Sequence, residues 1–149
     1  MQIASNKKNR REDKILVCIP SYNAEESISV TIESALDQSV KNFKILVVDN
    51  NSTDKTSEIV ENIRHDNDNF EKIEFVANPS NLGRISNWNK CIELFLLSDF
   101  DYLKFLFTGD TLQKDCLEAL LDGFKRYDDK IGIVVAGYNN TEGGMVKKD

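Results

Sequence analysis

Residues 44–54 read Lys-Ile-Leu-Val-Val-Asp-Asn-Asn-Ser-Thr-Asp, and the predicted fold is organised around this stretch. Its apolar run, residues 45–48, is β-branched at three of four positions, which is typical of a parallel strand buried on both faces. The run ends at Asp49, and turn residues and a helical pattern follow. A carboxylate at the C-terminal end of a buried strand lies where open α/β sheets bind their ligands.

The same alternation of strand and helix recurs along the chain. Further strands are predicted at residues 14–19, closed by Pro20, and at 73–77, 102–107 and 131–136. Short connections between alternating strands and helices predict an α/β fold, with a mostly parallel sheet and helices on both faces.

Helix starts and helix faces follow from capping residues and periodicity. Asn23 with Glu26 has the spacing of a capping box, and Ser52 or Thr53 is expected to cap the next helix. A helix is predicted over residues 84–97. Its inner side is expected to carry Ile85, Trp88, Ile92, Phe95 and Leu96.

Length and composition limit the class of protein. The 149 residues predict a single domain at 14–138, between a disordered basic tail at 1–13 and a frayed tail at 139–149. The net charge of −6 argues against a nucleic-acid partner. Three cysteines without metal-ligand spacing predict free thiols in a reducing, cytoplasmic location. No apolar run approaches the ~20 residues of a membrane span.

The loops after the strands argue against several common α/β families. The turn after the first strand lacks the glycines of a dinucleotide-binding fold and the acidic pair of a receiver domain. The chain also lacks a P-loop and a nucleophile elbow. What remains is a set of polar residues after three strands, which a parallel sheet gathers at one edge.

Four motifs, in this order, resemble those of family 2 glycosyltransferases. They are Ile15–Glu26 with its Pro-Ser-Tyr-Asn loop, Val47–Asp54, Asn81-x-Gly83 followed by Asn-Trp-Asn, and Thr108-Gly-Asp110. The resemblance covers about residues 14–138 and implies a three-layer α/β/α fold of the GT-A type. It also implies transfer of a sugar, with inversion, from a nucleotide-sugar donor to a polysaccharide or other glycan precursor, with Mg²⁺ or Mn²⁺.

The first two motifs would bind the base of the donor. Asp49, beside Asn51, would accept the N3–H of uracil or thymine, because a carboxylate only accepts hydrogen bonds. The donor would then be UDP- or dTDP-linked; a helix-capping Asp49 is the alternative. Pro20 and Tyr22 would form the wall against the base, although Tyr22 also fits simple packing. Asn23 and Glu25 fit either the site or an ordinary helix start.

The last two motifs would bind the diphosphate and the metal. Asn81 and Gly83 would shape the loop near the ribose and diphosphate, with Gly83 supplying a positive φ. Arg84 would neutralise a phosphate or would be a solvated residue at a helix start. Asp110 would hold the metal. Gly109 stands where the family usually has an acidic residue.

The resemblance leaves the catalytic residue unassigned, because the family's general base comes from an acceptor-binding half that nothing here matches. The alternative function is a non-catalytic nucleotide-binding or protein-interaction module with the same fold. Association of two copies is left open.

Overall fold

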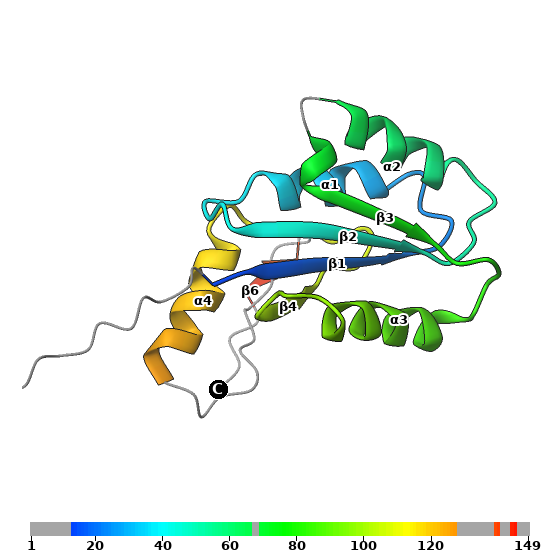
Figure 1. Ribbon diagram of the computed structural model, residues 1–149. Coiled ribbons are helices and arrows are strands. Elements are labelled where there is room, and N and C mark those ends of the chain that lie inside the picture. The colour runs from blue at the N-terminus through cyan, green and yellow to red at the C-terminus, as the bar shows by residue number, and fades with distance from the viewer. Residues whose placement is uncertain (1–12, 67–68, 128–138, 141–143, 146–149) are drawn as a thin grey trace, which may run out of the picture.

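A computed structural model describes residues 13–66, 69–127, 139–140 and 144–145 of the chain. One parallel sheet has the strand order β3-β2-β1-β4 (Figure 1). Its strands are β1 (Ile15–Ser21), β2 (Phe43–Asp49), β3 (Ile73–Ala77) and β4 (Tyr102–Phe105). The predicted α/β class and the parallel sheet are confirmed.

Helices cover both faces of this sheet, as expected. They are α1 (Ile28–Leu36), α2 (Thr56–His65), α3 (Arg84–Leu96) and α4 (Cys116–Tyr127), with a short 3₁₀ turn η1 (Asn69–Glu71). Successive strand residues point to opposite faces. In β1, Val17 therefore packs in the core beneath α1, α2 and α4, whereas Cys18 packs against Cys91 of α3 in a second core.

The first strand is longer than predicted. It continues through Pro20 to Ser21, and all seven of its residues are buried. Proline cannot donate to a ladder, but β4 pairs with β1 only as far as Cys18. Pro20 thus lies beyond the point where β1 has strands on both sides. The fourth strand is shorter than predicted and ends at Phe105 instead of Phe107.

Both predicted helix starts were wrong. The helix α1 begins at Ile28, not after Asn23, and α2 begins at Thr56, not after Ser52 or Thr53. The predicted capping residues bind other parts of the chain instead. They join the loop after β1 to the loop after β2, which delays the start of each helix.

The predicted inner face of α3 was also largely wrong. Ile85, Ile92 and Leu96 are exposed, while Asn87 and Cys91 are buried. The helix is rotated so that the Asn87 amide reaches the backbone of β2. The buried face of α3 also carries Cys91, Leu94 and Phe95, which pack on the core with Cys18 and Leu16 of β1.

Near the C-terminus, β5 (Asn139–Asn140) and β6 (Gly144–Met145) form a two-stranded antiparallel ladder. The predicted strand at 131–136 and the basic tail at 1–12 lie outside the described residues, so the expected states of the two tails stay predictions. Within the described part of the chain, no helix has the length and apolar character needed to cross a bilayer.

Candidate functional site

Asp49 is the buried centre of the edge where the parallel strands end. Its Oδ1 accepts hydrogen bonds from the Ser21 hydroxyl at 3.0 Å and the Ser52 hydroxyl at 2.5 Å. Its Oδ2 accepts the Ser52 backbone N–H at 2.8 Å. The residue is only 1% exposed. Asp49 therefore joins the ends of β1 and β2 and holds the following loop, rather than capping α2 directly.

The loops after β1 and β2 are bound to each other through side chains. Asn23 accepts the Thr53 N–H at 2.9 Å, and its own N–H donates to the Ser52 hydroxyl. Glu25 accepts the Lys55 N–H at 3.0 Å. Asn23 has a φ of 47°, in the left-handed region that asparagine tolerates better than most residues. Both predicted site residues thus shape the site by holding the loops together.

Asp54 completes this connection. Its carboxylate accepts the Glu25 N–H at 3.0 Å and both the N–H and the hydroxyl of Thr56. Burial pushes the pKa of Asp54 upward, but the hydrogen bonds from Thr56 and Glu25 outweigh it, so the pKa lies below its ordinary value. The ionised form is therefore the one that holds the two loops.

A cluster of four asparagines connects the ends of β2 and β3 with the start of α3. Asn50 donates to Asn81 at 2.9 Å, and Asn78 donates to Asn50 at 3.2 Å and to Asn87 at 2.8 Å. Asn87 donates in turn to the Val48 carbonyl at 3.0 Å. Asn50, Asn78 and Asn87 are buried, whereas Asn81 is exposed. Neutral amides can both donate and accept, so the three buried side chains are satisfied without an unpaired charge.

The loop before α3 has the predicted positive φ. Gly83 has φ 81° and ψ 160°, a region almost restricted to glycine. Asn81 accepts the Gly83 N–H at 2.8 Å, and Asn50 accepts the Leu82 N–H at 2.9 Å. The asparagine cluster therefore fixes the loop at which the resemblance places the ribose and diphosphate.

The turn after β4 presents Asp110. The Asp110 N–H donates to the Phe107 carbonyl at 3.0 Å, and Gly109 has φ 94° inside this turn. The buried Thr31 hydroxyl of α1 donates to the Asp110 carbonyl at 3.1 Å and accepts the Gly109 N–H at 3.0 Å. Position 109 thus needs a residue that adopts a positive φ, which accounts for glycine there.

Asp110 by itself supplies only part of the ligand set that a metal ion needs. Its side chain is exposed, and no group of three or more His, Cys, Asp or Glu side chains in the described ranges could hold a metal ion. Mg²⁺ is commonly bound by one or two carboxylates together with phosphate oxygens and waters. The residues therefore fit a metal that arrives with a diphosphate, not one held by protein ligands alone.

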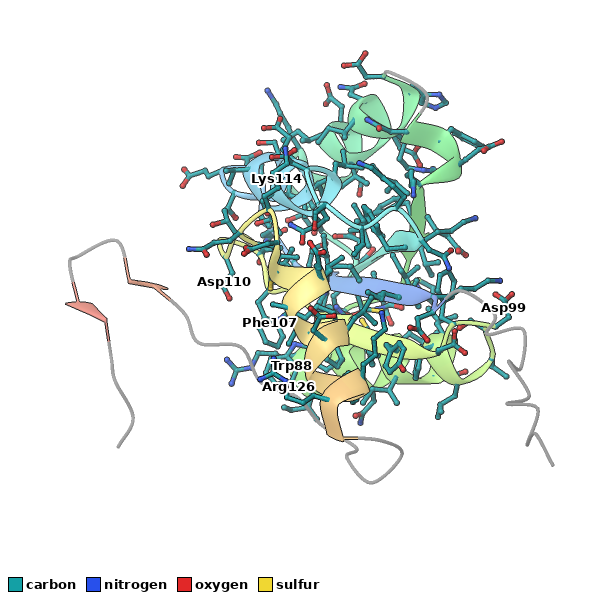
Figure 2. All side chains as sticks on the ribbon, turned by 90° about the vertical axis from the view of Figure 1, so that its left-hand side faces the viewer. Trp88, Asp99, Phe107, Asp110, Lys114 and Arg126 are labelled. Atoms are coloured by element: carbon teal, nitrogen blue, oxygen red, sulfur yellow. The ribbon has the colours of Figure 1, made fainter. Side chains whose placement is uncertain are left out.

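Exposed aromatic and cationic groups lie at the same edge. The Tyr22 ring is 48% exposed after the buried Pro20. The Arg84 guanidinium lies 5.6 Å from the Trp88 ring centroid, and Trp88 lies 4.9 Å from Phe107. Figure 2 shows Trp88, Phe107 and Asp110 along one side of the molecule, away from Asp99. Asn51, with φ 63°, is exposed in the loop after Asp49.

The sequence reasoning missed the residues that support the site. These are the partners of Asp49, the members of the asparagine cluster and the turn-holding hydroxyl, namely Ser21, Ser52, Asn50, Asn78, Asn87 and Thr31. One signal could have found some of them. Asn50 and Asn78 each follow a strand directly, so a parallel sheet places them at the same edge.

Comparison with known proteins agrees with the resemblance found in the sequence. The family model for glycosyl transferase family 2 matches residues 16–148. The amylovoran biosynthesis glycosyltransferase AmsB of Erwinia amylovora is 32% identical over 137 residues, which is 89% of this chain and 44% of that protein. The chain thus spans less than half the length of this relative.

Solved structures share the fold. S. aureus TarS 1–349 is 27% identical and has a TM-score of 0.62, covering 74% of this chain and 32% of that one. Its complex with UDP-GlcNAc has a TM-score of 0.66 at 20% identity, over 85% and 38% of the two chains. The mannosyltransferase PcManGT of Pyrobaculum calidifontis, with GDP-Man and Mn²⁺, has a TM-score of 0.51 at 20% identity, over 57% and 25%.

The sheet order, the polar groups at the strand ends and the family model agree over nearly all of the described residues. This chain belongs to glycosyl transferase family 2.

Proposed function

We propose that this chain is the donor-binding part of an inverting glycosyltransferase that uses a UDP- or dTDP-linked sugar. The observation that carries the proposal is Asp49, a buried carboxylate held at the C-terminal end of β2. The UDP-GlcNAc complex of TarS, a structure with the same fold, supports a nucleotide-sugar donor. The acceptor is a polysaccharide or other glycan precursor, in line with the naming of AmsB for amylovoran biosynthesis.

Asp49 recognises the base in this proposal. Its Oδ2 accepts the Ser52 N–H and keeps acceptor capacity for the N3–H of uracil or thymine. Because Asp49 is 1% exposed, the adjoining loop at Asn51 must open for this contact. The exposed Tyr22 ring then stacks on the base. Cytosine presents an acceptor at N3 and would leave two acceptors facing each other.

The diphosphate lies between the loop at Asn81–Arg84 and the turn at Asp110 in this proposal. Arg84 is exposed and supplies positive charge at the start of α3. Mg²⁺ or Mn²⁺, held by Asp110 and phosphate oxygens, would stabilise the departing diphosphate as a Lewis acid. The Mn²⁺ complex of PcManGT supports a metal in this fold. We propose a cytoplasmic location, which the free thiols of all three cysteines support.

Isothermal titration calorimetry of the 149-residue chain with UDP, with and without Mn²⁺, tests the proposal. We expect binding that Mn²⁺ strengthens and that is about tenfold weaker for CDP, because cytosine would place its N3 acceptor, not a donor, against the Asp49 carboxylate. Asp49→Asn should lose the preference for UDP over CDP. Asp110→Asn should lose the effect of Mn²⁺.

Asp54→Asn is the matched control. Asp54 also accepts three hydrogen bonds from loop groups, so its substitution perturbs the same loops without touching the base. This variant should keep the preference for UDP. Equal loss in both variants would mean that Asp49 acts only through loop structure. An absence of heat at millimolar nucleotide would instead favour the interaction-module function.

A further inference from the structure

The turn that presents Asp110 lies in a segment without regular structure. Residues 106–115, between β4 and α4, form neither helix nor strand. In the sheet that the structure describes, β4 is an edge strand, and it pairs with β1 over four residues. The position of Asp110 therefore depends on contacts outside the sheet.

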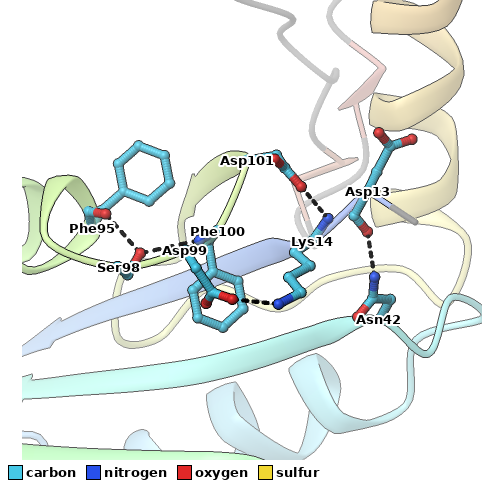
Figure 3. Close-up of polar contacts among 8 residues, drawn as sticks. All are labelled: Asp13, Lys14, Asn42, Phe95, Ser98, Asp99, Phe100 and Asp101. Carbon is cyan, nitrogen blue, oxygen red and sulfur yellow. Dashed lines mark hydrogen bonds and ion pairs between the residues drawn. The ribbon is translucent and has the colours of Figure 1, made fainter. Parts of the chain in front are cut away.

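The start of β4 is held by the residue before β1 (Figure 3). The Lys14 N–H donates to the Asp101 carboxylate at 2.9 Å, and the Lys14 ammonium pairs with Asp99. The Asp101 N–H donates in turn to the Lys14 carbonyl at 2.9 Å. These contacts lie at the opposite end of β4 from Asp110, so they do not fix the turn that follows the strand.

Three polar side chains on one side of α1 and its C-terminal end bind the backbone of the irregular segment. They are Thr31, Ser34 and Gln38, separated by three and four residues. The Ser34 hydroxyl accepts the Leu112 N–H at 3.1 Å. The Gln38 amide donates to the Gln113 carbonyl at 2.9 Å. The shape of the segment after β4 is therefore set largely by α1.

Thr31 makes the contacts nearest to the proposed metal ligand. Its hydroxyl accepts the Gly109 N–H at 3.0 Å and donates to the Asp110 carbonyl at 3.1 Å. One hydroxyl thus binds the backbone of both residues, and the direction of the Asp110 side chain depends on that backbone. Thr31 is 0% exposed, and its β-branched side chain is restricted at χ1, so the hydroxyl is held in place without a ligand.

We propose that Thr31 is a positioning residue, which holds the Asp110 carboxylate where a metal ion bound to the donor diphosphate meets it. This inference rests on the proposed function and adds a residue of α1 to the same site. Asp110 is the only carboxylate in residues 106–114. The turn thus offers the metal a single carboxylate, and groups that orient a metal ligand typically change metal affinity 10- to 100-fold.

Calorimetry of the 149-residue chain with UDP, with and without Mn²⁺, tests this role. Thr31→Val keeps the shape of the side chain but removes the hydroxyl, and we expect it to reduce the strengthening by Mn²⁺ about tenfold. The preference for UDP over CDP should remain, because the proposed base contact is at Asp49, at the end of another strand. Thr31→Ser keeps the hydroxyl and should retain the Mn²⁺ effect.

Two control variants separate positioning from loss of stability. Val60→Ala removes buried methyl groups from the core shared by α1 and α2, so it destabilises the fold without removing a contact to the Asp110 turn. Asp101→Ala removes the hydrogen bond from Lys14 at the start of β4. Both variants should keep the full Mn²⁺ effect. If they lose it as Thr31→Val does, Thr31 acts only through stability and the proposal is overturned.

Amide hydrogen exchange followed by NMR, without nucleotide or metal, tests the contact itself. Exchange at Gly109 should be about tenfold faster in Thr31→Val than in the parent, and near the parent rate in Thr31→Ser. Unchanged exchange, or a full Mn²⁺ effect in Thr31→Val, would overturn the positioning role alone. A parent chain that binds UDP without any response to Mn²⁺ would overturn the proposed metal site and this inference with it.

Discussion

The Ser21 hydroxyl at the end of β1 donates a hydrogen bond of 3.0 Å to the Asp49 carboxylate at the end of β2. Both residues are buried, with exposed fractions of 2% for Ser21 and 1% for Asp49. The adjacent strands pair in register at these two residues. The bond therefore closes the sheet at the edge where the proposed donor site lies.

Removing this hydroxyl should destabilise the protein. Ser21→Ala leaves the buried carboxylate with one hydrogen bond fewer, so we expect the free energy of unfolding to fall by about 1.5–3 kcal/mol. Urea unfolding followed by circular dichroism measures the change. Ser29→Ala on α1, at a half-buried position, is the control and should stay within about 0.5 kcal/mol of the parent. A similar loss in both variants would contradict a special role for the Ser21–Asp49 bond.

The contribution of Asp54 to stability should depend on pH. Its pKa in the folded chain lies below the ordinary value of 3.8, so folding favours the ionised form. The stabilisation is present above about pH 4 and is lost as the pH falls from there through the folded pKa. Urea unfolding of the parent and Asp54→Asn should show a difference at pH 7 that shrinks below pH 4. If the stability difference between the parent and Asp54→Asn stayed constant below pH 4, the lowered pKa of Asp54 would be contradicted.

Loss of the Asn87 amide should break the asparagine cluster. Asn87→Leu keeps a side chain of similar length but leaves the Val48 carbonyl and the Asn78 amide without this partner. We expect a loss of about 2–4 kcal/mol, since each buried polar group left unpaired costs about 1–3 kcal/mol. Asn62→Ala, on the exposed side of α2, should be near neutral in the same urea titration. A neutral Asn87→Leu variant would show that the apolar gain offsets the lost bonds.

Substitution of Gly83 should lower the stability of the protein because of the backbone conformation at this position alone. A Cβ at this position would meet no atom within 4 Å, so a clash is not the cause. The φ of 81° with ψ of 160° is nevertheless strained for any L side chain, and Gly83→Ala should cost about 1–3 kcal/mol. Thermal unfolding measures the cost. If Gly83→Ala melts with the parent, the loop before α3 must have changed its conformation.

For some of the supporting residues, the sequence predicted a polar side chain at the right place but not its hydrogen-bond partner. The sequence showed polar side chains after each strand, and a parallel sheet had to gather them at one edge. It did not show that Asn23 and Glu25 accept hydrogen bonds from the loop at Thr53–Lys55. Capping patterns describe one local segment, and here a neighbouring loop about 30 residues away competed for the same side chains.

The order of strands and helices, the burial of β2 and the position of Asp49 at its end could be predicted without the structure. These follow from local patterns, because a continuous apolar run followed by turn residues has few alternatives in a small α/β domain. The buried face of α3, in contrast, depends on how the helix packs against the sheet. Because α3 carries apolar residues on two faces, helical periodicity cannot choose between them. The structure buries the face with Cys91, Leu94 and Phe95, where the Asn87 amide also donates to the Val48 carbonyl, and exposes Ile85, Ile92 and Leu96.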